Sequence, residues 1–326
     1  MIIAVDAMGS DHAPQVEVEG ALKFVEENKN VEIVLVGDSK KISEYLNFPH
    51  ERIKIIHTSE TIGSDEEPLK AIKTKKTSSM VMALKEVSEK RADAFVTAGN
   101  TGAALAGGLF ILGRIKGIER PALSPIFPGE KGEFIMLDIG ATSDGKAKYL
   151  EQYALLGSAY AETRGINNPR VGLLNIGVEE TKGDELRKEA YELLQNNKNI
   201  NFIGNVEARD IFKGYADVIV TDGFSGNVAL KVIEGTAGFV MQVLKTNLLS
   251  SLKSKILTFL LKKELKGMKK SLDYRETGGS LLIGVNAPLI KAHGSSNSYA
   301  FYNALKLSKT VCENNLIEKI KEKLEN

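Results

Sequence analysis

The stretch ADVIVTDGFSGNVALKVIEG, residues 216–235, holds the pattern that decides the fold. An uninterrupted apolar run, typical of a strand covered on both faces, leads into the polar loop 222–227 and then into a helical pattern. Gly223 and Gly226 lie in this loop, and glycines at such a junction let backbone N–H groups approach an anion at the helix N-terminus. The stretch therefore predicts a strand, an anion-binding loop and a helix that carries Lys231.

A second copy of this pattern occurs earlier in the chain. Residues 92–105, ADAFVTAGNTGAAL, match residues 216–229 at six of fourteen aligned positions, including both glycines. Thr101, which precedes the second glycine, Gly102, corresponds to Ser225. One matched pair is not a solenoid repeat, but it predicts two lobes of similar construction that face one cleft.

A third loop of this kind is expected in residues 172–183, GLLNIGVEETKG, where an apolar run ends in a glycine-punctuated loop carrying Lys182. Neither this loop nor loop 222–227 has the spacing GxGxxG or GxxxxGKS/T, so the two common nucleotide-binding fingerprints are missing. Two ordinary strand-to-helix turns are the alternative interpretation.

Composition limits the class of protein. With 326 residues, of which 43% are hydrophobic, the chain is long enough to bury a large core. A net charge of +1 argues against nucleic-acid binding driven by overall charge. One cysteine and four histidines exclude a disulfide scaffold and a Cys/His zinc cluster. The N-terminus does not resemble a signal peptide and no apolar run approaches about 18 residues, so a cytoplasmic protein is expected.

Strand-like apolar runs alternate with helical patterns along the chain. This alternation predicts an α/β fold with three αβα layers and a mostly parallel sheet. Because no Pro/Gly/Ser-rich linker interrupts it, we expect residues 1–326 to form a single domain with two lobes around a cleft. Prolines and glycines predict a bend over residues 125–132, and apolar periodicity predicts one long final helix over residues 298–324.

Residues 244–272 differ from the rest because they carry eight lysines and one acidic residue. Their periodicity predicts a protruding amphipathic basic helical segment, which can lie on an anionic membrane or contact a second subunit. A surface helix packed on its own protein is the alternative. The candidate contact residues are Leu252, Ile256, Phe259, Leu260, Lys262 and Lys263.

The remaining polar residues are mostly anion binders and dipoles. Asp11 and His12 follow the first strand, where open α/β sheets bind ligands, and Asn297 precedes the final helix. No GxSxG elbow and no metal-binding cluster is evident. The set suits a reaction in which bound phosphate is itself the reactant. Its other members are Asn100, Arg120, Lys146, Lys182, Ser225, Asn227, Lys231, Arg275 and His293.

These motifs resemble those of the PlsX-type phosphate acyltransferases, the fatty acyl-[acyl-carrier-protein]:phosphate acyltransferases of bacterial phospholipid synthesis. The resemblance covers nearly the whole chain. Small departures, such as Ser10 where a glycine is usual and Gly145 where a cysteine is frequent, remove no charged candidate. The motifs are VDAMGSDHAP (5–14), VTAGNTGA (96–103), LDIGATSDGK (137–146), GLLNIGVEETKG (172–183), GNVEARDI (204–211), DGFSGNVALK (222–231), GGSLLIGVN (278–286) and AHGSSN (292–297).

The resemblance implies that acyl-[acyl carrier protein] and inorganic phosphate react to give acyl phosphate and free carrier protein. It also implies a fold similar to isopropylmalate dehydrogenase, isocitrate dehydrogenase and phosphotransacetylase, a homodimer, and peripheral association with the membrane. A downstream membrane acyltransferase would receive the product. No organic cofactor and no metal is implied.

On this basis we assign roles as a hypothesis. Lys182 and the loop that begins at Asp222 bind phosphate, and Asn227 or a loop amide donates to the thioester oxyanion. Asn100 and its loop close the other side. Further candidates for substrate binding are Thr101, Gly102, Lys146, Gly223, Ser225, Gly226, Lys231, His293, Asn297, Asp11 and His12.

Three other functions remain open at this stage. A phosphate acyltransferase that uses coenzyme A would differ only in the thioester donor. A dehydrogenase on the same architecture would need nicotinamide and usually a divalent metal. A lipid-surface adaptor would keep the amphipathic segment but would not turn over acyl thioesters.

Overall fold

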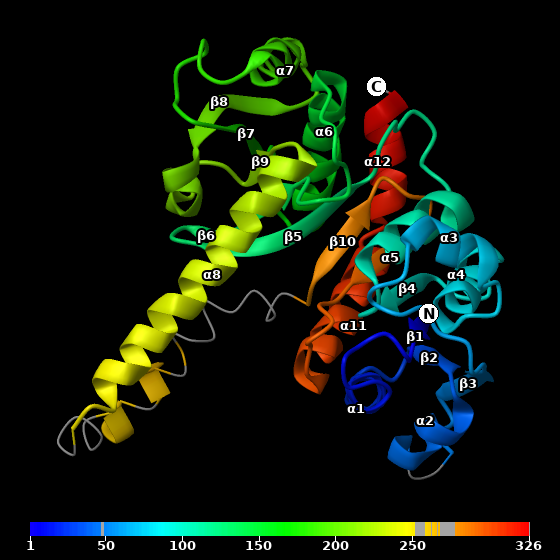
Figure 1. The fold of residues 1–326 in the computed structure, drawn as a ribbon. Coiled ribbons are helices and arrows are strands. Elements are labelled where there is room, and N and C mark those ends of the chain that lie inside the picture. Colours follow the sequence, from blue (N-terminus) through cyan, green and yellow to red (C-terminus); the bar gives the residue numbers. More distant parts are fainter. Residues whose placement is uncertain (47–48, 252–257, 262, 266, 268–277, 326) are drawn as a thin grey trace.

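The computed structural model describes residues 1–46, 49–251, 258–261, 263–265, 267 and 278–325. Its centre is one 11-stranded sheet in the order β3-β2-β1-β4-β11-β10-β5-β6-β9-β7-β8 (Figure 1). Two parallel blocks, β3-β2-β1-β4-β11 and β6-β9-β7-β8, form the first and second halves of the sheet. Strands β10 and β5 join the halves through antiparallel pairs.

The strands are β1 (Ile2–Asp6), β2 (Glu32–Gly37), β3 (Ile53–His57), β4 (Ala94–Thr97), β5 (Ala122–Gly129), β6 (Gly132–Leu137), β7 (Arg170–Asn175), β8 (Asn201–Glu207), β9 (Val218–Val220), β10 (Ser280–Ile283) and β11 (Leu289–Lys291). The helices are α1 (Gln15–Glu27), α2 (Ser39–Leu46), α3 (Pro68–Thr74), α4 (Ser79–Ser88), α5 (Thr101–Gly107), the π-helical η1 (Gly108–Leu112), α6 (Ala147–Thr163), α7 (Glu185–Asn196), the 3₁₀ turn η2 (Ala208–Lys213), α8 (Gly223–Leu248), α11 (Ser298–Glu313) and α12 (Leu316–Glu325).

Alternation along the strands creates two hydrophobic cores, one on each face of the sheet. In β1, Ile3 and Val5 belong to the core that also holds α1, α6, α7, α11 and α12. Ala4 belongs to the other core, which holds α3, α4, α5 and the start of α8. Because both faces of the strands are covered, the strand sequences are continuously apolar. The predicted α/β class with a mostly parallel sheet is confirmed.

The two copies found in the sequence are equivalent in the structure. Asp93 precedes β4 and its carboxylate accepts a hydrogen bond from the N–H of Ile2, at the start of neighbouring β1 (2.7 Å). Asp217 precedes β9 and accepts from the N–H of Arg170, at the start of neighbouring β7 (2.8 Å). The matched aspartates therefore set the register of the neighbouring strand in each half of the sheet.

Two predicted elements were wrong. Residues 125–132 form most of β5 and its turn into β6 rather than a bend. The first half of β5 pairs with Ser280 to Ile283 of β10, and the second half pairs with Gly132 to Ile135 of β6. Each half of β5 is therefore paired with a neighbouring strand on one side only. A proline is tolerated at such positions because its missing N–H is not needed there.

The final helix is broken into α11 and α12, because Asn315 adopts a positive φ of 51°. Asparagine tolerates this left-handed conformation, and the apolar periodicity gives no sign of the break. As a result, α11 packs on α1 while α12 packs on α6. The end of the chain thus covers both halves of the sheet.

The basic segment 244–272 lies only partly in the described residues. Helix α8 runs from Gly223 to Leu248 and projects away from the rest of the molecule (Figure 1). Phe259, Leu260 and Lys263 are described, whereas Leu252, Ile256, Lys262 and Arg275 lie outside the described residues. Among the helices in the described ranges, we find none long and apolar enough to span a membrane.

Helix α8 can begin where it does because two glycines let it pack against the backbone of loop 138–142. A Cβ atom at Gly226 would lie 1.9 Å from the carbonyl oxygen of Asp138. A Cβ atom at Gly223 would lie 2.1 Å from the carbonyl oxygen of Thr142. Both distances are far below van der Waals contact, so only glycine fits these positions.

Gly226→Ala should therefore lower the free energy of unfolding by at least about 2 kcal/mol, because backbone rather than a flexible side chain must move. Urea denaturation measures this. Gly235→Ala, in the same helix, is the matched control, since its Cβ atom would meet nothing within 4 Å. That variant should be neutral or up to about 1 kcal/mol more stable. Equal stability of the two variants would contradict the packing argument.

Candidate functional site

The N-terminus of α8 is held by a carboxylate and an arginine. Asp222 caps the helix by accepting from the N–H of Ser225 at 3.0 Å. Arg187 of α7 forms an ion pair with Asp222 and donates to the Ser225 hydroxyl at 2.7 Å. Burial acts to raise the pKa of Asp222, but its hydrogen bonds and Arg187 outweigh burial and the pKa is lowered. The anionic carboxylate thus fixes the loop 222–227.

Lys182 lies in a neighbouring loop that two buried amides hold in place. Asn175 donates to the carbonyl of Lys182 at 3.1 Å and to the Asn205 side chain at 3.1 Å. Asn205 in turn donates to the carbonyl of Glu179 at 2.8 Å. The Lys182 side chain is exposed, and within the described residues no carboxylate pairs with it. A fixed loop therefore presents an unneutralised cation.

Loop 140–146 connects these groups to the start of α6. The side chain of Asn227 lies 3.4 Å from the position of a Cβ atom on Gly140, so Asn227 faces this loop. Gly145 approaches Asp222 closely, with a Cβ position 2.8 Å from the Asp222 Cβ atom. Lys146 lies over the ring of Tyr149 at 5.5 Å. The predicted residues Asp222, Asn227 and Lys146 therefore lie where loop 140–146 and loop 222–227 meet.

A second polar cluster lies at the carboxyl ends of β1, β4 and β11. The buried Asp6 accepts from the hydroxyls of Ser79 at 2.7 Å and Thr97 at 2.8 Å. Lys291 is buried beside it and donates to the carbonyls of Ala98 and Ala292. Burial lowers the pKa of the Lys291 ammonium to about 8. Sequence reasoning pointed to Asp6 at the end of the first strand but missed Lys291, since its apolar neighbours hide it.

Helix α8 brings the two clusters together. The pKa of His293 is lowered first by burial and then by Lys291, and it also responds to Glu234, Lys231 and Asp11. Lys231 and Glu234 belong to α8 and form an ion pair at 2.9 Å. The predicted residues Asp11, Lys231 and His293 therefore share one electrostatic environment between the halves of the sheet.

Other predicted residues have structural contacts in place of free polar groups. Asn100 caps α5 through the N–H of Ala103, and its amide donates to carbonyls of Gly63, Ser64 and Glu66 at 3.1 Å each. Asn297 caps α11. Thr101 and His12 are exposed, and Gly102 is partly buried.

A further site residue that the sequence did not reveal is Glu17. It lies buried on α1, below the loop that carries Asp11, and accepts from the N–H of Ser10 at 2.9 Å. Among the residues that the structure describes, its other carboxyl oxygen has no hydrogen-bond partner, and neither does the Ser10 hydroxyl. Burial raises the pKa of Glu17 to about 7. A glutamate on an amphipathic helix gives no such signal by its sequence position.

A long apolar groove opens beside the N-terminus of α8. Its volume is about 970 Å³. Asp184, Arg187 and Ser225 line its polar end, an exposed apolar row along α8 lines one side, and residues of β5, β7 and η2 line the remainder. Members of this row are Phe224, Val228, Val232 and Val240. No group of three or more His, Cys, Asp or Glu side chains suited to a metal ion occurs in the described ranges.

The architecture is that of the phosphotransacetylases. A phosphotransacetylase from Streptococcus pyogenes superimposes with a TM-score of 0.64 at 18% identity, covering 98% of this chain and 94% of that one. A EutD phosphotransacetylase from Staphylococcus aureus gives a TM-score of 0.62 at 15% identity, covering 96% and 94%. At such identities the likeness concerns the fold alone.

The chain belongs to the fatty acid synthesis protein family, which it matches over residues 1–319. It is 53% identical to a phosphate acyltransferase from Streptococcus thermophilus, over 98% of this chain and 96% of that protein. A phosphate acyltransferase from a Geobacillus species is 52% identical over 100% of this chain and 99% of its own length. One from Oceanobacillus iheyensis is 55% identical over 96% and 94%.

The raised pKa of Glu17 predicts a specific pH dependence of stability. The ordinary value is 4.5 and the folded value about 7, so between them the folded protein retains a proton that the unfolded chain has released. Stability is lost as the pH rises through this window. Relative to Glu17→Gln, the wild type should lose about 3 kcal/mol between pH 4.5 and 7.

Chemical denaturation at several pH values measures this difference. Glu19→Gln, on the same helix, serves as the control for loss of a surface carboxylate. A difference between wild type and Glu17→Gln that stays constant with pH would show that folding does not raise the pKa of Glu17.

Proposed function

We propose that this protein is a phosphate acyltransferase that forms acyl phosphate from fatty acyl-[acyl carrier protein] and inorganic phosphate, in bacterial phospholipid synthesis. The observation that carries the proposal is the junction at the start of α8. There a glycine-rich helix N-terminus lies beside an apolar groove. Gly183 and Asp184, which directly follow Lys182, also line this groove, and within the described residues no carboxylate pairs with Lys182. Such a junction suits an inorganic anion and a fatty acyl chain at the same time. Family membership supports the same reaction.

Phosphate would bind between Lys182 and the backbone N–H groups at the start of α8. A helix N-terminus attracts anions through its free N–H groups and its dipole. Asp222 is already paired with Arg187, so its carboxylate holds the loop rather than meeting the phosphate. Because phosphate is itself a good nucleophile, the site needs to position it more than to activate it.

The bound phosphate oxygen would attack the thioester carbonyl carbon. The carbonyl oxygen becomes an oxyanion, to which Asn227 or a loop N–H donates. Collapse of this intermediate breaks the carbon–sulfur bond, leaving acyl phosphate, and the carrier thiolate then takes up a proton. Lys231 belongs to α8, and His293 follows β11 in the first half of the sheet. Because the charge of Lys231 acts on His293, the two side chains can orient the donor together.

The acyl chain would lie in the groove along α8. The exposed row from Phe224 to Val240 spans seventeen residues of one helix, or about 24 Å at the rise of an α-helix. Burying methylene groups there would stabilise binding by about 0.8 kcal/mol each. A long acyl donor therefore gains more from this groove than a short one does.

Lys182→Ala should reduce phosphate-dependent release of thiol from palmitoyl-carrier protein by at least about 100-fold, because the phosphate loses the positive charge of the lysine that binds it. Thiol release and acyl phosphate formation are measured together. Lys198→Ala, another exposed lysine of the second half, is the matched control and should retain wild-type activity. Turnover of Lys182→Ala within a few-fold of wild type would show that Lys182 does not bind the phosphate.

The same assay separates the competing functions. Release from palmitoyl-coenzyme A alone would identify a coenzyme A-dependent transferase. Reduction of a nicotinamide cofactor in the presence of a divalent metal would identify a dehydrogenase.

We further propose that the chain forms a homodimer and associates peripherally with anionic membranes, where a membrane acyltransferase receives the product. Beyond α8, Phe259 is 72% and Leu260 is 70% exposed, and Lys263 is also exposed. Exposed aromatic and aliphatic side chains next to lysines suit the interface of an anionic bilayer. Phe239 of α8, which does not line the groove, is 66% exposed as well and suits contact with a second copy.

Phe259→Ser combined with Leu260→Ser should lower co-sedimentation with vesicles containing anionic lipid by about tenfold, because apolar burial is lost. Phe110→Ser is the control, since Phe110 is an exposed aromatic side chain distant from this segment in sequence. Light scattering reports the oligomeric state. Unchanged vesicle binding together with conversion to a monomer would assign these residues to the dimer alone.

A further inference from the structure

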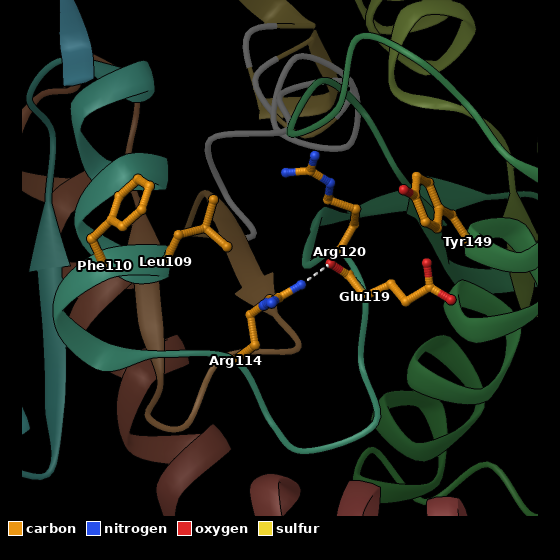
Figure 2. A pocket seen from close by; sticks show the side chains of 6 residues that line it. All are labelled: Leu109, Phe110, Arg114, Glu119, Arg120 and Tyr149. Atoms are coloured by element: carbon orange, nitrogen blue, oxygen red, sulfur yellow. Dashed lines mark hydrogen bonds between the residues drawn. The ribbon is translucent and has the colours of Figure 1, made fainter.

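A second cavity, separate from the apolar groove, lies between η1 and the start of α6. Its volume is about 530 Å³. Figure 2 shows Leu109 and Phe110 on one wall and Tyr149 on the other, with the side chains of Arg114, Glu119 and Arg120 between them. Phe110 is 65% exposed although it lies on a helix otherwise packed on the core. An aromatic side chain beside two guanidinium groups is the chemistry of a site for an organic anion.

Within the part of the chain that the structure describes, the positive charge of this cavity is not neutralised by ion pairs. Across the described ranges neither Arg114 nor Arg120 forms a salt bridge, although the Glu119 carboxylate contributes to the lining. Lys116 is exposed on the same loop. Lys146 lies at the Tyr149 wall. The cavity therefore attracts an anion, and the planar guanidinium groups suit phosphate oxygens.

The loop that carries the arginines is held rigidly. Asn286 donates to the carbonyls of Leu112 at 3.3 Å and Arg114 at 3.0 Å. The buried Gln152 accepts from the N–H of Glu119 at 2.9 Å and donates to the carbonyl of Gly117 at 2.8 Å. The cavity is thus formed before any ligand binds, which reduces the entropy cost of binding.

Contacts connect this cavity to the proposed phosphate loop. Tyr149 lines the cavity and lies under Lys146. The adjacent Gly145 packs against Asp222 at the start of α8. The cavity and the polar end of the apolar groove, which Ser225 and Arg187 line, are therefore both connected by contacts to the loops around Asp222. A substrate with a thioester in its middle could reach both.

We propose that this cavity binds the phosphodiester end of the phosphopantetheine arm of the thioester donor, with Arg120 and Arg114 on the phosphate and Phe110 against the arm. The inference rests on the proposed function, because only an acyl thioester donor brings such an arm to the site. The acyl chain then lies along α8, the arm lies toward η1, and the thioester carbonyl lies at the phosphate loop between them.

Arg120 is the residue to test, because Arg114 also donates to the carbonyl of Glu119 and its loss could loosen the loop. Calorimetry compares binding of free 4′-phosphopantetheine with binding of pantetheine, which lacks the phosphate. Wild type should bind the phosphorylated compound at least about tenfold more tightly. Arg120→Ala should abolish this preference and Arg120→Lys should restore part of it. Arg91→Ala, an exposed arginine elsewhere, should keep it in full.

A wild type without preference, or an Arg120→Ala variant that keeps it, would overturn the assignment. No turnover is measured, so this result does not depend on whether acyl phosphate forms.

Kinetics then distinguish the sources of the arm. Arg120→Ala should raise KM about tenfold for both palmitoyl-carrier protein and palmitoyl-coenzyme A, with kcat kept within about twofold. A rise in KM for palmitoyl-coenzyme A alone would overturn the proposal, because it would place the nucleotide phosphates in the cavity. A rise in KM for palmitoyl-carrier protein alone would also overturn it, because it would place the acidic surface of the carrier protein there.

Discussion

The structure depends on the contact between the first turn of α8 and loop 138–142. The buried Asp138 carboxylate accepts from four backbone N–H groups, those of Leu123, Gly140, Ala141 and Thr142, at 2.8–3.1 Å. These bonds fix the loop as a backbone surface. Gly223 and Gly226 let α8 approach that surface more closely than any side chain would allow. The direction of α8, and with it the position of every candidate site group on it, follows from this contact.

Because α8 is rigid, one helix can serve both halves of the sheet. Its N-terminus contacts Arg187 in the second half, and Lys231, two turns later, influences His293 in the first. Its remaining apolar face lines the groove. Anion, carbonyl and hydrocarbon are very different ligands, yet they can meet along one helix because an α-helix presents a different face every few residues.

The sequence predicted the polar loops well and their partners poorly. Loop 222–227, Lys182 and the matched copy at residues 92–105 were recognisable because glycines and hydroxyls cluster locally after apolar runs. Arg187 and Lys291 gave no such signal. Arg187 meets Asp222 across 35 residues, and Lys291 meets the carbonyl of Ala98 across 193. Contacts of this kind depend on how strands are ordered in the sheet, which local patterns do not report.

The sequence by itself determined the α/β class and the glycine-containing strand-to-helix loops, because these follow from side-chain periodicity and local turn chemistry. The tertiary structure alone decided which loops face one another, which carboxylates are buried and which amides are already used. Asn100 shows the difference. Its sequence position suggests a ligand contact, but its amide group donates to three carbonyls and its side-chain oxygen caps α5. Burial and hydrogen-bond partners are properties of neighbours in space, and long-range packing sets them.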